Sequence, residues 1–139
     1  MKKLSIIIVT WNTAQITKKC IETINHYLPQ NFAEIIIVDN GSTDNTSKVL
    51  TKFKNIIYFN SGSNLGFAAG CNAGAKLATS KYLLFLNSDM ELIDSTLVDM
   101  VSYLNSHSNV GLVGPRFLNP DMTPQGSVTP PQTPLNAIK

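Results

Sequence analysis

Three nearly continuous apolar runs constrain this chain more than any other feature of its sequence. Residues Leu4–Val9, Glu34–Asp39 and Tyr82–Asn87 are rich in isoleucine, valine, leucine and phenylalanine and do not alternate with polar residues. Strands that helices cover on both faces have this pattern, whereas strands of a half-exposed antiparallel sheet alternate. A fourth run, Asn55–Asn60, adds one more strand. The runs predict a parallel sheet inside an α/β fold.

Segments with helical patterns separate these strands. Three crossover helices and one later helix are expected, over Thr13–Tyr27, Asp44–Phe53, Phe67–Thr79 and Asp94–Ser106. The last of them precedes a final apolar run at Val110–Val113. Right-handed crossovers then give an open, mainly parallel, doubly wound α/β sheet. Asp44 and Asp94 stand where helices begin, so we interpret both as caps rather than as reactive carboxylates.

The segment Phe67–Thr79 carries two glycines, Gly70 and Gly74, that share one face of the expected helix. Each interior glycine costs a helix about 1 kcal/mol relative to alanine, so the pair requires a reason. Either the helix packs closely on the sheet, or a ligand approaches its backbone. We expect close packing to account for one glycine, but not for the whole string from Asn64 to Asn72.

Composition bounds the organisation and the partners of the chain. Its 139 residues suffice for one domain, which we expect over 1–115, followed by a proline-rich irregular tail over 116–139. The net charge is +2, the lysines are scattered and Arg116 is the only arginine, which argues against nucleic-acid binding. No apolar run is long enough to cross a membrane, so a cytoplasmic protein is expected.

Polar residues follow three of the expected strands. They are Thr10-Trp11-Asn12, Asp39-Asn40-Gly41-Ser42 and Asn87-Ser88-Asp89. Ligands of open α/β sheets bind beyond the carboxyl ends of the strands, so these residues form the expected site. Neither a GxGxxG nor a GxxxxGK[ST] motif is present, so a bound diphosphate would need a metal to neutralise it. Asp89 is the best candidate ligand for Mg²⁺ or Mn²⁺.

Four motifs in order resemble the family 2 glycosyltransferases, which have the GT-A fold. They are SIIIVTWN (5–12), IIIVDNGSTDNT (35–46), NLGFAAGCNAG (64–74) and YLLFLNSDMEL (82–92). The resemblance covers roughly the first 90 residues. The segment 114–121 also resembles a rhamnosyltransferase-like subset of the family, which implies a dTDP-linked donor and leaves UDP-linked sugars open.

The resemblance implies a nucleotide-sugar pocket. Its expected nucleotide-binding residues are Thr10, Trp11, Asn12, Asp39, Asn64, Gly66, Asn72, Asn87 and Ser88. Asp39 would bind the base or the ribose, and Asp89 would hold the divalent metal that bridges the diphosphate. Ser88 stands where many relatives have aspartate. Without the resemblance, Trp11 could be a core residue, and Asp39 and Asp89 could be turn formers.

The implied reaction is sugar transfer with inversion, from a UDP- or dTDP-linked donor to the hydroxyl of a glycan or lipid-linked acceptor. Bacterial cell-surface polysaccharide synthesis is the expected setting, with peripheral association at the inner face of the membrane and self-association as further expectations. The family's general base belongs to a motif expected beyond Lys139. We therefore expect this chain to be a donor-binding part without the acceptor-binding half. The alternative is a catalytically silent nucleotide-binding module.

Overall fold

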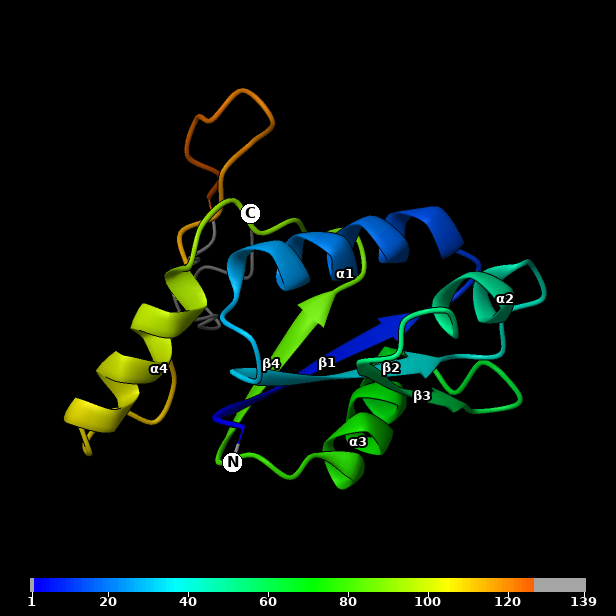
Figure 1. Ribbon diagram of the computed structural model, residues 1–139, viewed down its shortest axis with the longest axis horizontal. Coiled ribbons are helices and arrows are strands. Elements are labelled where there is room, and N and C mark those ends of the chain that lie inside the picture. The colour runs from blue at the N-terminus through cyan, green and yellow to red at the C-terminus, as the bar shows by residue number, and fades with distance from the viewer. Residues whose placement is uncertain (1, 127–139) are drawn as a thin grey trace, which may run out of the picture.

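A four-stranded parallel sheet forms the centre of the computed structural model, which describes residues 2–126 (Figure 1). Its strands are β1 (Leu4–Thr10), β2 (Ala33–Asp39), β3 (Ile56–Asn60) and β4 (Tyr82–Asn87). They lie in the order β3-β2-β1-β4, so the chain builds outward from β1 and then returns to place β4 on the other side of β1. The predicted open, doubly wound α/β sheet is confirmed.

Helices cover both faces of this sheet. They are α1 (Ala14–Tyr27), α2 (Thr46–Leu50), α3 (Phe67–Leu77) and α4 (Thr96–Ser106). Figure 1 shows α1 and α2 on one face and α3 on the other. Ile6 and Ile8 pack in the core on the α1 side, together with Leu97 of α4, whereas Ile7 packs on the α3 side. Successive residues of a strand point to opposite faces, which is why β1 is apolar at consecutive positions.

Helix α2 is shorter than the predicted range of 44–53. Its sequence is rich in Ser, Thr and Asn, whose side chains compete for backbone hydrogen bonds. The hydroxyl of Thr51 donates to the carbonyl of Ser47 at 2.7 Å. The N–H of Phe53 donates to the carbonyl of Leu50, three residues before it, which ends the helical pattern. The N-cap of this helix is Asn45 rather than Asp44, but Asp44 accepts the N–H of Thr46, the first helical residue, at 2.9 Å.

Close packing accounts for both glycines of α3, which corrects the expectation that it accounts for one. A Cβ atom at Gly74 would lie 2.4 Å from a methyl group of Ile7, and one at Gly70 would lie 2.9 Å from a methyl group of Val9. Any larger residue at either position would push α3 off β1. The helix ends at Leu77, two residues before its predicted end, where the chain turns to hydrogen-bond with β2.

Strand β4 is less covered than its sequence predicts. Leu83 and Phe85 are 45% and 49% exposed, because α3 packs on β1 and β2 and leaves this side of β4 open. β4 also forms one edge of the four-stranded sheet. An apolar strip therefore remains accessible beside α3 among the described residues.

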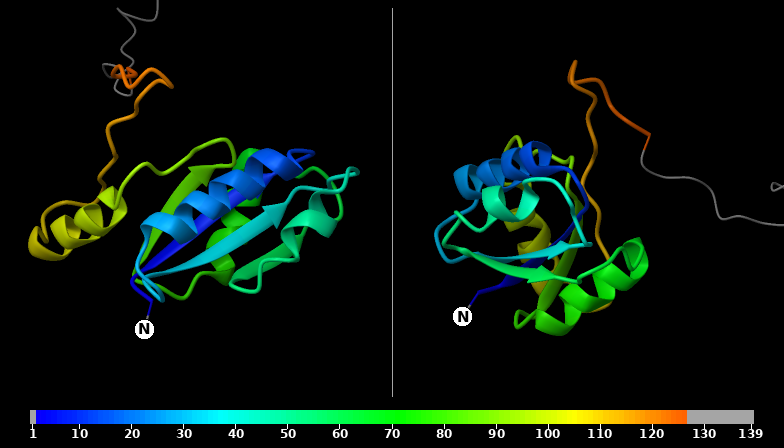
Figure 2. Two further views of the ribbon diagram at one scale, coloured as in Figure 1. Left: turned by 45° about the horizontal axis from the view of Figure 1, so that its top comes forward. Right: turned by 90° about the vertical axis from the view of Figure 1, so that its right-hand side faces the viewer.

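The chain after α4 contains one isolated antiparallel bridge, between Leu118 and Pro124, and no helix or strand up to residue 126. The apolar run Val110–Val113 belongs to this irregular chain. Figure 2 shows the segment 115–126 running away from the sheet. The remainder of the predicted tail, 127–139, lies outside the described residues. Over residues 2–126, no helix has the length and apolar character needed to span a membrane.

Candidate functional site

The strand register brings the predicted site residues to one edge of the sheet. Thr10 of β1 lies beside Asp39 of β2, which lies beside Asn60 of β3, and Val9 lies beside Asn87 of β4. With β1 between them, β2 and β4 are two strand spacings apart, or about 10 Å. The strand order reverses at β1 and β4, which is where open α/β sheets bind ligands.

Asp39 is fully buried at 0% exposure, and both of its carboxylate oxygens are engaged. The backbone N–H of Ser42 donates to Oδ1 at 2.8 Å, and the hydroxyl of Tyr58 donates to Oδ2 through a short hydrogen bond. Burial and this bond to the carboxylate raise the pKa of Tyr58 to about 12. Tyr58 therefore remains a hydrogen-bond donor throughout the physiological range.

Thr10 is turned into the fold rather than toward the edge. Its hydroxyl lies 2.8 Å from those of both Thr13 and Thr17, so it ties the end of β1 to the first turn of α1. Its side chain is buried and offers no surface to a ligand in this structure. Trp11, the next residue, is 52% exposed, so it is not a core residue.

Asn12 joins the loops that follow β1 and β2. Its side-chain oxygen accepts the backbone N–H of Thr43 at 2.8 Å and that of Asp44 at 3.3 Å. Its own N–H donates to the hydroxyl of Ser42 at 2.9 Å. Asn12 adopts a φ of 54°, in the left-handed region that asparagine tolerates better than most residues. The amide oxygen of this predicted nucleotide-binding residue thus holds a loop.

Asn64 and Gly66 are held in place by Asn40, one of the polar residues that were expected at the carboxyl edge but were not predicted to bind the nucleotide. The amide of Asn40 donates to the side-chain oxygen of Asn64 at 2.9 Å, and its oxygen accepts the N–H of Leu65 at 2.9 Å. Gly66 has a φ of 81° and begins α3. Asn40 therefore connects the end of β2 to the start of α3.

Asn72 lies apart from these residues. It is exposed on α3, two positions from both Gly70 and Gly74, so it lies on the side of the helix away from the sheet. Of the predicted nucleotide-binding residues, Asn72 is the one that does not lie at the carboxyl edge of the sheet.

Asp89 follows the end of β4 and is exposed, as is Asn87, while Ser88 is half-buried. Within residues 2–126 the Asp89 carboxylate makes no hydrogen bond or ion pair, and no group of three or more Asp, Glu, His or Cys side chains gathers there. One free carboxylate beside a hydroxyl fits the way Mg²⁺ and Mn²⁺ bind through one or two carboxylates, water and substrate phosphates. These residues therefore fit the implied metal, with the remaining ligands supplied by the diphosphate and water.

Tyr58 is a site contact that the sequence did not predict, and the role of Asn40 as a link between two loops was not predicted either. A tyrosine in an apolar strand gives no signal of its hydrogen-bond partner, because that partner depends on the pairing of β2 with β3. Asn40 had a signal, since an amide beside Asp39 at a strand end is well suited to join two loops.

An open, doubly wound parallel sheet with polar loops at its carboxyl edge defines a class of α/β domains that bind ligands at that edge. This chain belongs to glycosyl transferase family 2, whose family pattern matches residues 5–134. The resemblance recognised from the four motifs is thereby confirmed.

Two similar proteins come from staphylococci. The chain is 31% identical over 119 residues to the poly(ribitol-phosphate) beta-N-acetylglucosaminyltransferase TarP of Staphylococcus aureus, covering 82% of this chain and 36% of that protein. It is also 31% identical over 121 residues to the teichoic acid poly(glycerol phosphate) polymerase of Staphylococcus epidermidis, covering 83% of this chain and 16% of that protein. The chain thus spans well under half the length of these relatives.

Solved structures share the fold. Staphylococcus aureus TarS in complex with UDP-GlcNAc matches with a TM-score of 0.71 and 25% identity, over 76% of this chain and 32% of that chain. The mannosyltransferase PcManGT of Pyrobaculum calidifontis matches with a TM-score of 0.69 and 21% identity, over 73% of this chain and 32% of that chain. The predicted GT-A fold is confirmed by these similarities.

Proposed function

We propose that this chain is the donor-binding part of an inverting glycosyltransferase and that it binds a nucleotide-diphosphate sugar at the carboxyl edge of its sheet. Two carboxylates at this edge are the main support: Asp39 lies at the end of β2 and Asp89 follows β4, with β1 between the two strands. A nucleoside diphosphate presents hydrogen-bond donors at its base and ribose and negative charge at its phosphates. Two separated acidic groups, one of them free to bind a metal, suit those two ends.

Asp39 is the proposed partner of the nucleoside. An ionised carboxylate only accepts hydrogen bonds, so it fits the ring N–H of uracil or thymine, or the hydroxyls of ribose. Because Asp39 is fully buried, contact with a nucleotide requires part of the loop over residues 41–44 to move. Trp11 is exposed at the neighbouring strand end and offers a flat apolar surface to the base.

Asp89 is the proposed protein ligand of the metal, with Asn87 and Ser88 beside it. The chemistry that a bound Mg²⁺ or Mn²⁺ supplies is neutralisation of the charge that develops on the leaving phosphate. The Asp89 carboxylate is exposed and has no partner among the described residues, so no existing interaction must be broken for it to bind.

The attacking hydroxyl of the acceptor needs a general base within hydrogen-bond reach. The family resemblance implies that this base belongs to a later motif of the family, and this stays a prediction. Asp121 is a poor candidate, because its carboxylate accepts hydrogen bonds from both the backbone and the hydroxyl of Thr123. A transfer assay on this chain separates a donor-binding part that turns over from a catalytically silent nucleotide-binding module.

The relatives suggest the setting. The names of these two relatives refer to poly(ribitol-phosphate) and to teichoic acid, which supports a glycan or lipid-linked acceptor and cell-surface polysaccharide synthesis. An acceptor of that kind is consistent with peripheral association at the inner face of the membrane. The exposed strip of Leu83 and Phe85 on β4 supports self-association of this chain.

A thermal-shift panel of UDP, dTDP, GDP and ADP, each with and without Mn²⁺, tests the proposal on the full chain. Ligand binding to the folded state stabilises it by about 2.7 kcal/mol at a hundredfold excess over Kd. We expect a Mn²⁺-dependent shift with UDP or dTDP that Asp89→Ala abolishes. Asp99→Ala, which removes an exposed carboxylate of α4, is the matched control and should keep the shift.

The panel also decides between donors. A shift with UDP alone assigns a UDP-linked sugar, and a shift with dTDP alone supports the rhamnosyltransferase-like resemblance. A Mn²⁺-dependent shift that survives Asp89→Ala would exclude Asp89 as the metal ligand, and the absence of any shift would overturn the proposal for this chain.

A further inference from the structure

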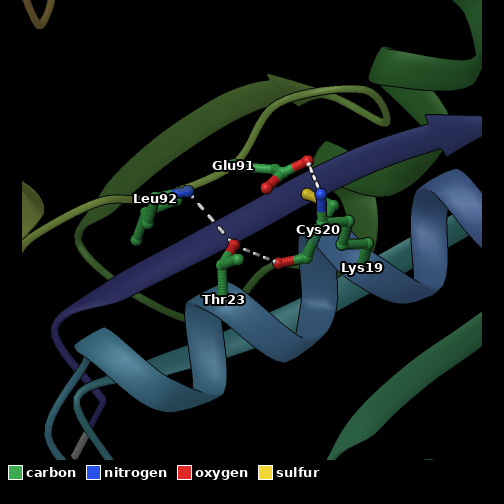
Figure 3. Close-up of polar contacts among 5 residues, drawn as sticks. All are labelled: Lys19, Cys20, Thr23, Glu91 and Leu92. Carbon is green, nitrogen blue, oxygen red and sulfur yellow. Dashed lines mark hydrogen bonds and ion pairs between the residues drawn. The ribbon is translucent and has the colours of Figure 1, made fainter. Parts of the chain in front are cut away.

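Helix α1 contacts the segment around Asp89 at three points on one face. Figure 3 shows Lys19, Cys20 and Thr23 of α1 next to Glu91 and Leu92, which follow Asp89 in the chain. Positions four apart in a helix lie on the same side, so Lys19 and Thr23 meet this segment together. The four motifs of the family resemblance include neither of them.

Thr23 makes a directed bond to the segment. Its hydroxyl donates to the carbonyl of Cys20 at 2.8 Å and accepts the backbone N–H of Leu92 at 3.1 Å. The single hydroxyl proton is used within the helix, which leaves the oxygen lone pairs for the N–H of Leu92. This side chain therefore provides a direct polar link between α1 and the backbone of Leu92.

Two more contacts tie α1 to residues on either side of Asp89 in the chain. The ammonium group of Lys19 lies 2.7 Å from a carboxylate oxygen of Glu91, with side chains 65% and 44% exposed. Before Asp89, the thiol of Cys20 lies 3.9 Å from the carbonyl of Asn87. That same carbonyl accepts the N–H of Met90 at 3.2 Å and closes the turn that carries Asp89.

Helix α1 is itself tied to the other end of the site. Thr17 contacts Thr10 at the end of β1, and it lies three positions, or nearly one turn, before Cys20 on the helix. One rigid element thus spans the strand end next to Asp39 and the turn that carries Asp89. A helix is well suited to hold two such points at a constant separation.

We propose that Thr23 and Lys19 are positioning residues for the metal-binding turn and that they hold the segment 87–92 so that Asp89 faces the diphosphate. The inference rests on the proposed function, because it assigns a role toward the metal at Asp89. Thr23 acts through Leu92, and Lys19 acts through Glu91. Neither side chain is among the predicted nucleotide-binding residues.

The test compares UDP and dTDP binding with and without Mn²⁺ in the full chain, by titration calorimetry. Thr23→Val keeps the shape of the side chain and removes the hydroxyl. We expect the Mn²⁺-dependent part of the affinity to fall about three- to tenfold, as for loss of one hydrogen bond, while metal-free binding stays unchanged. Thr23→Ser keeps the hydroxyl and should restore the wild-type value.

Lys19→Met should reduce the Mn²⁺-dependent part of the nucleotide affinity about twofold, because the ion pair between Lys19 and Glu91 is largely exposed. Lys18→Met is the matched control, because Lys18 pairs with Glu22 within the same helix at 2.9 Å and does not contact the segment 87–92. Hydrogen exchange at the Leu92 amide should accelerate in Thr23→Val and not in Lys18→Met.

The outcomes separate this inference from the function on which it rests. A wild-type chain that binds these nucleotides without any effect of Mn²⁺ overturns the metal site, and the inference falls with it. A wild-type Mn²⁺ effect that is unchanged in Thr23→Val overturns the inference alone. An equal loss of metal-dependent and metal-free binding would show a general structural role and would likewise overturn it.

Discussion

The hydroxyl of Tyr58 on β3 donates a hydrogen bond to Oδ2 of Asp39 on β2, so an edge strand orients the buried carboxylate of its neighbour. The other oxygen, Oδ1, is held by the N–H of Ser42. A carboxylate with one bond to each oxygen has little freedom to rotate. Movement of the loop over residues 41–44 would break the bond from Ser42, so Tyr58 is the contact that keeps Asp39 oriented when a nucleoside binds.

Tyr58→Phe removes one of these two bonds and leaves the aromatic ring in place. We expect UDP or dTDP affinity to fall about three- to tenfold, which corresponds to a hydrogen bond of roughly 0.5–1.5 kcal/mol. Tyr82→Phe is the control, since it removes a similar hydroxyl bond, to Asn105 at 2.9 Å, from β4. Titration calorimetry on both variants gives the comparison. Equal affinities in the two variants would contradict the role given to Tyr58.

Asn12→Ala should destabilise the fold by about 1–3 kcal/mol for two separate reasons. The variant loses the oxygen that accepts the N–H groups of Thr43 and Asp44, and it places alanine at a φ of 54°. Asn12→Gly relieves the backbone strain but not the lost acceptor, whereas Asn12→Asp keeps the acceptor. Urea denaturation should therefore rank Asn12→Asp above Asn12→Gly, and Asn12→Gly above Asn12→Ala. A different order would mean that the loop is held in another way.

Glu34 should make stability depend on pH. This buried carboxylate, at the opposite end of β2 from Asp39, accepts the backbone N–H of Thr79 at 2.6 Å and hydroxyl bonds from Thr79 and Ser5. Burial raises the pKa of Glu34, but these hydrogen bonds outweigh it and hold the pKa below its ordinary value. A lowered pKa contributes stability above the unfolded-state pKa, which is about 4.3, and that stability is lost as the pH falls.

Glu34→Gln tests this account. We expect the variant to be less stable than the wild type by about 1–3 kcal/mol at pH 7, because the amide is a weaker acceptor and brings unneeded donors. The difference should shrink as the pH falls below about 4. Denaturation curves at a series of pH values measure it. A difference that stays constant with pH would exclude the charge of Glu34 as the cause.

Gly74→Ala should destabilise the chain although alanine favours helices. The added Cβ would lie 2.4 Å from an Ile7 methyl group and 3.1 Å from one of Val38. Overpacking of this kind costs about 1–3 kcal/mol, against a gain of about 1 kcal/mol in helix propensity, so we expect a net loss of up to about 2 kcal/mol. Gly114→Ala has open space around the added atom and should be nearly neutral. Thermal unfolding of both variants distinguishes the two sites, and a stabilised Gly74→Ala would contradict the packing described for α3.

Local sequence patterns determined the elements and the edge that carries the site. Continuous apolar residues in β1 and β2 predicted strands covered on both faces, and polar residues after Thr10, Asp39 and Asn87 predicted the carboxyl edge. The motifs identified the family for the same reason, since strand runs and the turns after them are encoded within short windows. Most boundaries match the prediction within one residue, whereas α2, α3 and α4 are shorter than predicted by two or more residues at one end or both. At these ends the side chains of Asp44, Glu34 and Asp94 accept backbone N–H groups.

Tertiary structure alone decided what each polar side chain contacts. The pairing of β2 with β3 brings Tyr58 to Asp39, and the packing of α1 on the sheet turns Thr10 inward and brings Thr23 to Leu92. These partners are 19, 7 and 69 positions apart along the chain, and no short sequence motif links the two members of a pair. Hydrogen bonds depend on distances of a few ångströms and on direction, so they are settled only when the register and the helix packing are in place.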